Sequence, residues 1–138
     1  MNTRERIVAH AERWLNTPYH HMADVLGVGV DCAMLPVRVF CDLGLVPRFD
    51  PRPYPHDWML HRSEERYLSF ITPRAHQVES PHPGDLALFR FGRCAAHAGI
   101  VCEPGYMIHA HLPARRVTRA EIAPYLPRLH SYWSVIGV

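Results

Sequence analysis

Apolar residues near the amino terminus recur at the spacing of one face of a helix. The opposite face is charged, which is typical of a helix that docks on a core. Asn2 is suited to cap this helix, because Glu5 follows three residues later. Pro18 predicts its end, since proline disfavours helix at the residue before it. The apolar positions are Ile7, Val8, Ala11, Trp14 and Leu15.

Residues 32–43 form a nearly continuous apolar stretch. Its two strongly polar residues, Arg38 and Asp42, are four apart and therefore share one ridge of a helix. We expect a central helix that is buried on nearly all other sides, with Asp31 as its N-cap. Pro36 would loosen the opening turn of this helix, so a helix that starts nearer Pro36 is the alternative.

The second half of the chain predicts one more helix and a small antiparallel sheet. Asp57 is suited to cap a helix over residues 58–70, after the proline-rich loop 46–55. Short apolar runs bounded by glycine and proline predict strands. These runs span residues 86–91, 98–102, 106–112 and 131–138. The sequence therefore predicts an α+β fold that forms a single domain over residues 1–138.

The turn between the second and third predicted strands decides which histidines share a face. Pro104 and Gly105 mark that turn. If residues 103–105 form a three-residue loop, His97 and His109 become diagonal neighbours on one face of the sheet. Their Cβ atoms would then lie about 7 to 8 Å apart, within reach of a hydrogen bond between the imidazoles. A two-residue loop would place the two side chains on opposite faces.

Composition adds few constraints. A length of 138 residues fits one domain, and 48% apolar residues are ordinary for a globular protein. The net charge of +2 gives no strong field for nucleic acid, and no apolar run is long enough to span a membrane. The four cysteines form no Cys-x-x-Cys pair, which favours reduced thiols. We expect synthesis in the cytosol without a signal peptide.

Cys32 is the candidate nucleophile, because it lies where a polar loop meets the apolar helix. A helix N-terminus favours an anion, so we expect a lowered thiol pKa. The imidazole of His97 would take the thiol proton and later protonate the leaving amine. His109 would hold that imidazole in one tautomer, and Tyr19 with nearby backbone N–H groups would stabilise an oxyanion.

A metal site is an alternative use of these residues. Cys94 and His97 have the spacing of half a zinc knuckle, and Cys102, His109 and His111 follow on predicted strands. His97 and Cys102 differ in parity along one strand, however, and so point to opposite faces. We therefore expect no metal and no cofactor. Solvated surface is the prediction for the remaining histidines, which are His10, His20, His21, His56, His61, His76, His82 and His130.

Several short motifs resemble the NlpC/P60 superfamily of papain-like cysteine peptidases, and in particular its phage tail-associated branch. The resemblance spans most of the chain and rests on the order and spacing of the motifs, which are Thr17-Pro18-Tyr19 followed by Gly29-Val30-Asp31-Cys32, Pro83-Gly84-Asp85-Leu86-Ala87-Leu88-Phe89, His97-Ala98-Gly99-Ile100-Val101 and Met107-Ile108-His109-Ala110. It implies a papain-like fold without metal, in which a central helix carries the nucleophile and packs on a small antiparallel sheet. Carried over by position, Cys32 is the nucleophile and His97 the general base and acid. His109 is then the orienting residue, and Tyr19 supplies the hydroxyl beside the thiol.

The resemblance also implies a substrate and partners. The family is known for cleaving peptidoglycan stem peptides, so a stem peptide is the expected substrate. Other phage tail proteins are expected partners, with the virion tail as a location. Where most members have Asp-Cys-Ser-Gly-Leu, this chain has Ala33 and Met34 after the cysteine, which changes the surroundings of the nucleophile. The alternative function is therefore a phage tail assembly protein that keeps the fold with little or no catalysis.

Overall fold

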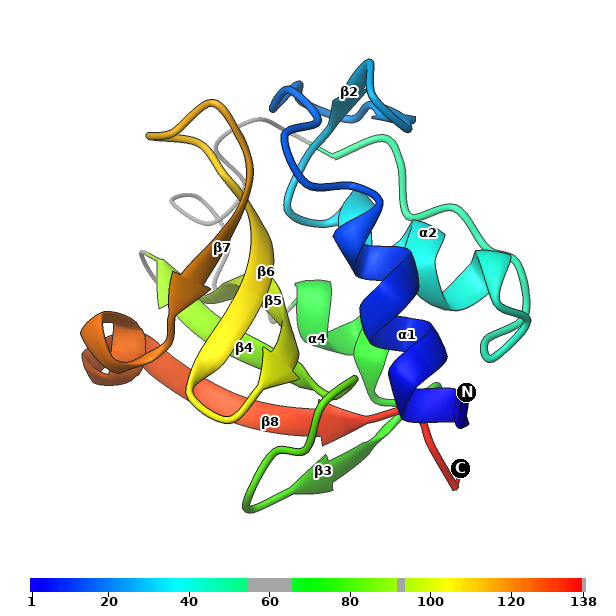
Figure 1. Cartoon of the computed structure of the whole chain (residues 1–138), viewed down its shortest axis with the longest axis vertical. Coiled ribbons are helices and arrows are strands. Elements are labelled where there is room, and N and C mark those ends of the chain that lie inside the picture. The colour runs from blue at the N-terminus through cyan, green and yellow to red at the C-terminus, as the bar shows by residue number, and fades with distance from the viewer. Residues whose placement is uncertain (55–65, 92–93, 138) are drawn as a thin grey trace.

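One antiparallel sheet of six strands organises the molecule (Figure 1). The computed structural model describes the backbone of residues 1–54, 66–91 and 94–137. The strands of the sheet are β3 (His76–Val78), β4 (Leu86–Phe91), β5 (Cys94–Glu103), β6 (Tyr106–His111), β7 (Arg116–Glu121) and β8 (Leu129–Ser134). Their order across the sheet is β3-β8-β4-β5-β6-β7. A separate two-stranded ribbon pairs β1 (Asp24–Val25) with β2 (Gly29–Val30).

Helices cover one face of this sheet (Figure 1). α1 (Thr3–Glu12) and α2 (Met34–Asp42) contact each other and β5, and α4 (Arg66–Ile71) also contacts β5. A short 3-10 helix, η1 (Ala123–Arg128), contacts β4. This arrangement confirms the predicted α+β fold with a central helix packed on an antiparallel sheet. Within the described ranges, no helix has both the length and the apolar character that crossing a membrane requires.

Alternating side chains of the strands build two apolar clusters. Leu86 and Leu88 of β4 belong to the larger cluster, which includes the buried residues of α1 and α2. Ala87 and Phe89 belong to a smaller cluster with Ile122, against which Tyr125 of η1 packs. Successive strand residues point to opposite faces, so the two clusters lie on the two faces of the sheet.

The observed helix boundaries differ from the predicted ones. α1 ends at Glu12, earlier than the apolar pattern indicates. Trp14 is buried as the pattern indicates, but it lies in the turn that follows the helix. α2 begins at Met34, two residues before Pro36, so the proline lies in the first turn, where it is tolerated. Of the helix predicted over 58–70, α4 covers the end; Asp57 and the rest of residues 55–65 lie outside the described part of the chain.

The sheet contains two edge strands that the sequence pattern did not predict. β7 is mostly polar, and only Val117 of its residues is fully buried. β3 has three residues, none of them fully buried. An edge strand has a neighbour on one side only and needs few apolar side chains, so neither strand shows the pattern of a buried strand.

The β5–β6 hairpin places His97 and His109 on one face as predicted, but with a shorter turn and a bulge. The turn has two residues, Pro104 and Gly105, because Glu103 pairs with Tyr106; the predicted three-residue loop is wrong. A register shift between Val101 and Glu103 compensates for the shorter turn, and Ile100 then pairs with Ile108. Continuing this register places His97 and His109 on one face. The bulge near Cys102 therefore restores the parity that a plain two-residue loop would have lost.

A buried ion pair ties the start of α1 to the loop before β4. The Asp85 carboxylate is 1% exposed and accepts hydrogen bonds from Arg4 Nη1 at 2.8 Å and from the His82 backbone N–H at 2.8 Å. We expect Arg4→Ala to lower the free energy of unfolding by about 2 kcal/mol, because the buried carboxylate loses its positive partner. Urea unfolding measures this. Arg6→Ala is the matched control, since Arg6 is exposed on the same helix; an equal effect of both variants would contradict the prediction.

Candidate active site

Cys32 lies in a tight turn that leads into α2. The regular helix begins at Met34, but the Asp31 side chain already accepts the Met34 N–H at 2.9 Å. The Asp31 carbonyl accepts the Leu35 N–H at 3.2 Å. Asp31 therefore caps the turn that holds the half-buried Cys32, whereas the N-cap of α2 is Ala33, which makes no side-chain hydrogen bond. Cys32 lies before the helix and not in its first turn, so the start of α2 is nearer to the alternative that placed it by Pro36.

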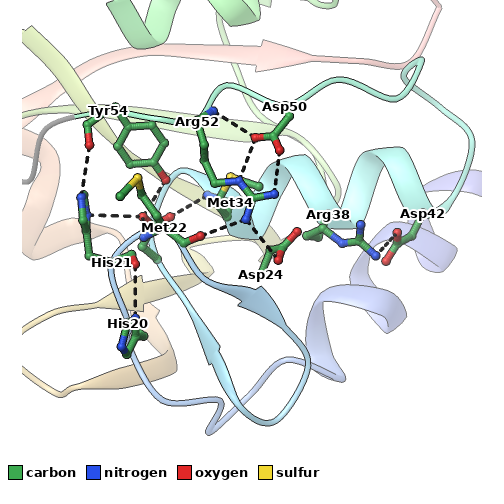
Figure 2. A network of polar contacts seen from close by, with 11 residues as sticks. His20, His21, Met22, Asp24, Met34, Arg38, Asp42, Asp50, Arg52 and Tyr54 are labelled. Carbon is green, nitrogen blue, oxygen red and sulfur yellow. Dashed lines mark hydrogen bonds and ion pairs between the residues drawn. The ribbon is translucent and has the colours of Figure 1, made fainter.

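The carboxylate of Asp31 has further partners that the sequence did not reveal. It is 1% exposed and accepts hydrogen bonds from the Tyr54 hydroxyl at 2.6 Å and from the Met22 N–H at 2.7 Å. His21 Nδ1 lies 3.8 Å from the same carboxylate, and His21 Nε2 lies 3.2 Å from the Tyr54 carbonyl oxygen. Figure 2 shows His21, Met22 and Tyr54 lying close to one another. The prediction of solvated surface is therefore wrong for His21.

Arg52 joins the two loops that carry these partners. Its guanidinium contacts Asp50 at 2.7 Å and Asp24 at 3.2 Å, and it donates to the Met22 carbonyl at 3.0 Å (Figure 2). The interaction with Asp50 raises the pKa of Arg52 and lowers the pKa of Asp50 to about 2. Asp50 is exposed, so solvent screens much of that pair. The contacts nevertheless connect the residue 22–24 segment to the residue 50–54 segment beside Asp31.

Tyr19 reaches Cys32 because residues 16–20 run between β7 and β2. The Tyr19 N–H donates to the Arg115 carbonyl at 2.8 Å, and Tyr19 forms a parallel bridge with Val30 of β2. The Tyr19 hydroxyl lies 4.0 Å from Cys32 Sγ. Burial raises the pKa of Tyr19, so its hydroxyl keeps its proton and can donate it in a hydrogen bond. The predicted approach of Tyr19 to Cys32 is present.

His97 and His109 form a hydrogen-bonded pair on the face of the sheet that carries Phe89. His97 Nε2 and His109 Nδ1 are 2.8 Å apart, and the two residues are 8% and 0% exposed. The His97 ring also contacts the Phe89 ring, with centroids 6.2 Å apart. Nε2 is therefore the nitrogen of His97 that faces His109. The spacing of the two histidines in the sequence therefore predicted a real contact.

Burial keeps the groups of the site neutral. Burial and, to a smaller extent, the charge of Asp31 together raise the pKa of the Cys32 thiol to about 12, against smaller opposing effects of the Tyr19 hydroxyl and of the Cys32 and Ala33 backbone N–H groups. Burial lowers the pKa of His97 to about 3 and that of His109 to about 4, with additional repulsion from neighbouring imidazoles. The expected lowering of the thiol pKa is therefore wrong, because desolvation outweighs the end of the helix. A neutral thiol and a neutral imidazole are the resting forms.

The buried imidazoles predict a loss of stability in acid. The pKa values of His97 and His109 lie near 3 and 4 in the folded protein, against 6.5 for an ordinary histidine. Below about pH 6.5 these two imidazoles bind protons in the unfolded chain but not in the folded chain, so the free energy of unfolding falls with decreasing pH. Urea unfolding from pH 7.5 to pH 4.5 measures the slope. We expect His97→Gln to reduce the slope and the exposed His76→Gln to leave it unchanged; identical slopes in all three proteins would contradict this origin.

The candidate metal ligands are not gathered into a site in the part of the chain that the structure describes. Among the described residues, no three His, Cys, Asp or Glu side chains gather as metal ligands. The side chain of Cys94 lies outside that description. The pairing of His97 with His109 uses one nitrogen of each ring in a hydrogen bond instead.

Comparison with solved structures identifies the class of fold. The NlpC/p60 domain of the peptidoglycan hydrolase SagA aligns with a TM-score of 0.68 and 20% identity, over 96% of this chain and 99% of that domain. The chain therefore has the NlpC/P60 fold, as the sequence resemblance implied. No family model matches the sequence, and no curated protein matches it either.

Two further structures show the same fold within longer proteins. NlpC1 from Trichomonas vaginalis aligns with a TM-score of 0.70 and 19% identity, over 96% of this chain and 45% of that protein. The peptidoglycan hydrolase RipB from Mycobacterium tuberculosis aligns with a TM-score of 0.64 and 19% identity, over 98% of this chain and 65% of that chain. The chain thus spans less than half the length of NlpC1 and about two thirds of RipB.

Proposed function

We propose that the protein is a cysteine peptidase that cleaves an amide bond in peptidoglycan stem peptides. Cys32 is the nucleophile and His97 the general base and acid in this proposal, and His109 orients His97. The hydrogen bond of 2.8 Å between the two imidazoles carries the proposal, because it builds the orienting contact that a cysteine nucleophile needs behind its base. SagA and RipB, which share the fold, are peptidoglycan hydrolases, and this supports the choice of substrate.

The reaction follows from the neutral resting state of the site. As Sγ attacks the carbonyl carbon of the scissile amide, the thiol proton passes to His97 Nδ1, and the carbonyl oxygen becomes an oxyanion. The oxyanion is stabilised by the Tyr19 hydroxyl and by backbone N–H groups of the turn at Cys32. Collapse of the intermediate breaks the carbon–nitrogen bond, and His97 returns the proton to the leaving amine. Water then hydrolyses the thioester, with His97 again acting as base and then as acid towards Sγ.

The proposal requires Cys32 Sγ and His97 Nδ1 to approach each other. Cys32 packs against the larger apolar cluster, on the face that the helices cover, whereas the His97 ring contacts Phe89 of the smaller cluster on the other face. α2 contacts β5, the strand that carries His97, and Cys32 lies just before the start of α2. His109 accepts the His97 Nε2–H in the reacting tautomer, which leaves Nδ1 unprotonated for the thiol. The assignment of His97 as base therefore depends on Nδ1, a requirement that thiol alkylation can test directly.

The biological setting belongs to the same proposal. The sequence motifs resemble the phage tail-associated branch, so we place the enzyme in a phage or prophage tail, with other tail proteins as partners and synthesis in the cytosol. The assembly alternative is favoured by one observation, the raised pKa of Cys32, because a thiol that keeps its proton is a poor nucleophile without help from a base.

Digestion of purified muropeptides tests the proposed activity. The wild-type protein and Cys32→Ala are incubated with muropeptides of defined stem length, and products are identified by mass spectrometry. We expect cleavage of one amide bond by the wild type and no product from the variant. Circular dichroism and urea unfolding of Cys32→Ala control for folding. The absence of any Cys32-dependent product would support the assembly role instead.

A further inference from the structure

The pair His97–His109 continues into a larger cluster of aromatic rings. The His109 ring stacks on His111, with centroids 4.9 Å apart and planes at 23°. Tyr125 of η1 meets the edge of His109, with centroids 5.5 Å apart, and its hydroxyl lies 3.3 Å from His111 Nε2. In the sequence, His111 is a candidate for a metal ligand only. In the structure it stands directly behind the orienting histidine.

His109 depends on these ring contacts for its orientation. Its Nδ1 is hydrogen-bonded to His97, but in the described part of the chain its buried Nε2 has no hydrogen-bond partner. When His97 donates through Nε2, His109 must carry its own proton on this unpartnered nitrogen. An unpaired buried N–H is unfavourable, so hydrogen bonding alone does not hold the ring. The stack with His111 and the edge contact with Tyr125 supply the remaining constraint.

We propose that His111 is an acid-sensing positioning residue: its ring holds His109 in place, and its protonation puts a positive charge against the histidine pair and suppresses formation of the imidazolium at His97. The inference rests on the proposed function, because it assigns His111 a role in the proton transfer from Cys32. His111 is only partly buried, whereas His109 is fully buried. His111 is therefore the member of the cluster that solvent protons reach first.

The charges around His111 determine the sign of the effect. The groups that face it are His109 on its own strand, His97 on β5, Tyr125 on η1 and Arg116, its register partner on β7. Burial lowers the pKa of His111, and the His111 charge opposes protonation of His97 and His109. His111 acts electrostatically on His97 and His109, whereas the groups that shift the pKa of Cys32 are its own and the Ala33 backbone N–H, Asp31 and Tyr19, so repulsion of the imidazolium outweighs attraction of the thiolate.

Alkylation of Cys32 provides a measurement that does not require a substrate. Conversion of thiol and neutral imidazole to thiolate and imidazolium neither takes up nor releases a proton. The alkylation rate is therefore independent of pH between the low pKa of His97 and the high pKa of Cys32. Protonation of His111 should lower this plateau by about threefold as the pH falls below 6.5, given the distances between the rings. The rate at Cys32 is measured with iodoacetamide on the full chain, from pH 4.5 to pH 8, and resolved by mass spectrometry of the Cys32 peptide.

Two substitutions of His111 separate its two roles. His111→Phe keeps a flat ring but cannot be protonated, so the decrease of the alkylation rate at acid pH should disappear. His111→Ala removes the ring, so its rate at pH 8 should fall about tenfold below that of His111→Phe. The exposed His76→Phe is the control and should retain the wild-type step. Urea unfolding at pH 8 shows which variants are folded, and an NMR titration of the His111 ring in the wild type locates its protonation independently.

Each outcome bears on the inference. A step that persists in His111→Phe overturns the acid-sensing role, and equal rates of the Phe and Ala variants at pH 8 overturn the positioning role. The muropeptide digestion tests the proposed function separately. A step that depends on His111 without any muropeptide product would refute the peptidase and support the inference about the histidine cluster. Product formation by a protein whose alkylation rate does not decrease at acid pH would support the peptidase and refute the inference about His111.

Discussion

Replacing His97 by alanine should lower kcat/KM for the proposed muropeptide cleavage by about a thousandfold or more, because the substitution removes the group that we propose takes the thiol proton. Burial raises the pKa of Cys32 to about 12, so the thiol cannot ionise alone near neutral pH. The same substitution should abolish the flat alkylation profile of Cys32 and leave a rate that rises continuously with pH. Both measurements use the variant at pH 6 to 9.

A matched substitution separates the base from a general effect of losing an imidazole. His82→Ala removes an exposed histidine whose side chain faces solvent, and it should leave both profiles unchanged. If His97→Ala and the wild type show the same alkylation profile, Nδ1 of His97 is not the proton acceptor. The assignment of the base would then be wrong, even if Cys32 itself were required for cleavage.

The sequence contained enough information for the central helix and the histidine pair. Asp31 followed by an apolar stretch predicted a helix close to Cys32, and the structure has that helix from Met34, with Asp31 capping the turn before it. The spacing of His97 and His109 predicted a shared face, and the rings are hydrogen-bonded. Local features of this kind depend on short-range periodicity, which a sequence records directly.

The surroundings of Asp31 could not be predicted in the same way. Tyr54 and His21 reach its carboxylate from loops that have no periodicity, and Arg52 joins those loops through Asp24. A contact between distant loops depends on the whole fold and leaves no mark in the local pattern. The bulge near Cys102 is a similar case, since one residue in the β5–β6 hairpin determines the faces of both histidines.

The thiol pKa shows why a local rule can give the wrong sign. A cysteine at a helix N-terminus is expected to ionise more readily, and the Cys32 and Ala33 N–H groups do act in that direction. The packing that brings Tyr19 and the helix together also removes water from the sulfur, and Asp31 adds a negative charge beside it. Desolvation is the larger effect, and only the assembled fold reveals it.

Asp31→Ala should have the largest effect on stability, lowering the free energy of unfolding by about 3 to 5 kcal/mol. The substitution removes the acceptor for the Met22 and Met34 N–H groups and for the Tyr54 hydroxyl, and all of these hydrogen bonds lie at a carboxylate that is 1% exposed. Urea unfolding measures the loss. Asp50→Ala is the control within the same network, because Asp50 is exposed and its removal should cost less than about 1 kcal/mol.

Asp31→Asn separates the charge of this residue from its packing. The amide is nearly isosteric and keeps one acceptor oxygen, so the free energy of unfolding should fall by only about 1 to 2 kcal/mol. The negative charge beside Cys32 disappears, and since that charge raises the thiol pKa, the pKa should decrease and alkylation of Cys32 should become several-fold faster at pH 8. A variant that is less stable yet more reactive would establish Asp31 as a group that holds the turn together at the cost of thiol acidity. Slower alkylation in a folded Asp31→Asn protein would show instead that the carboxylate positions Cys32 more than it suppresses its ionisation.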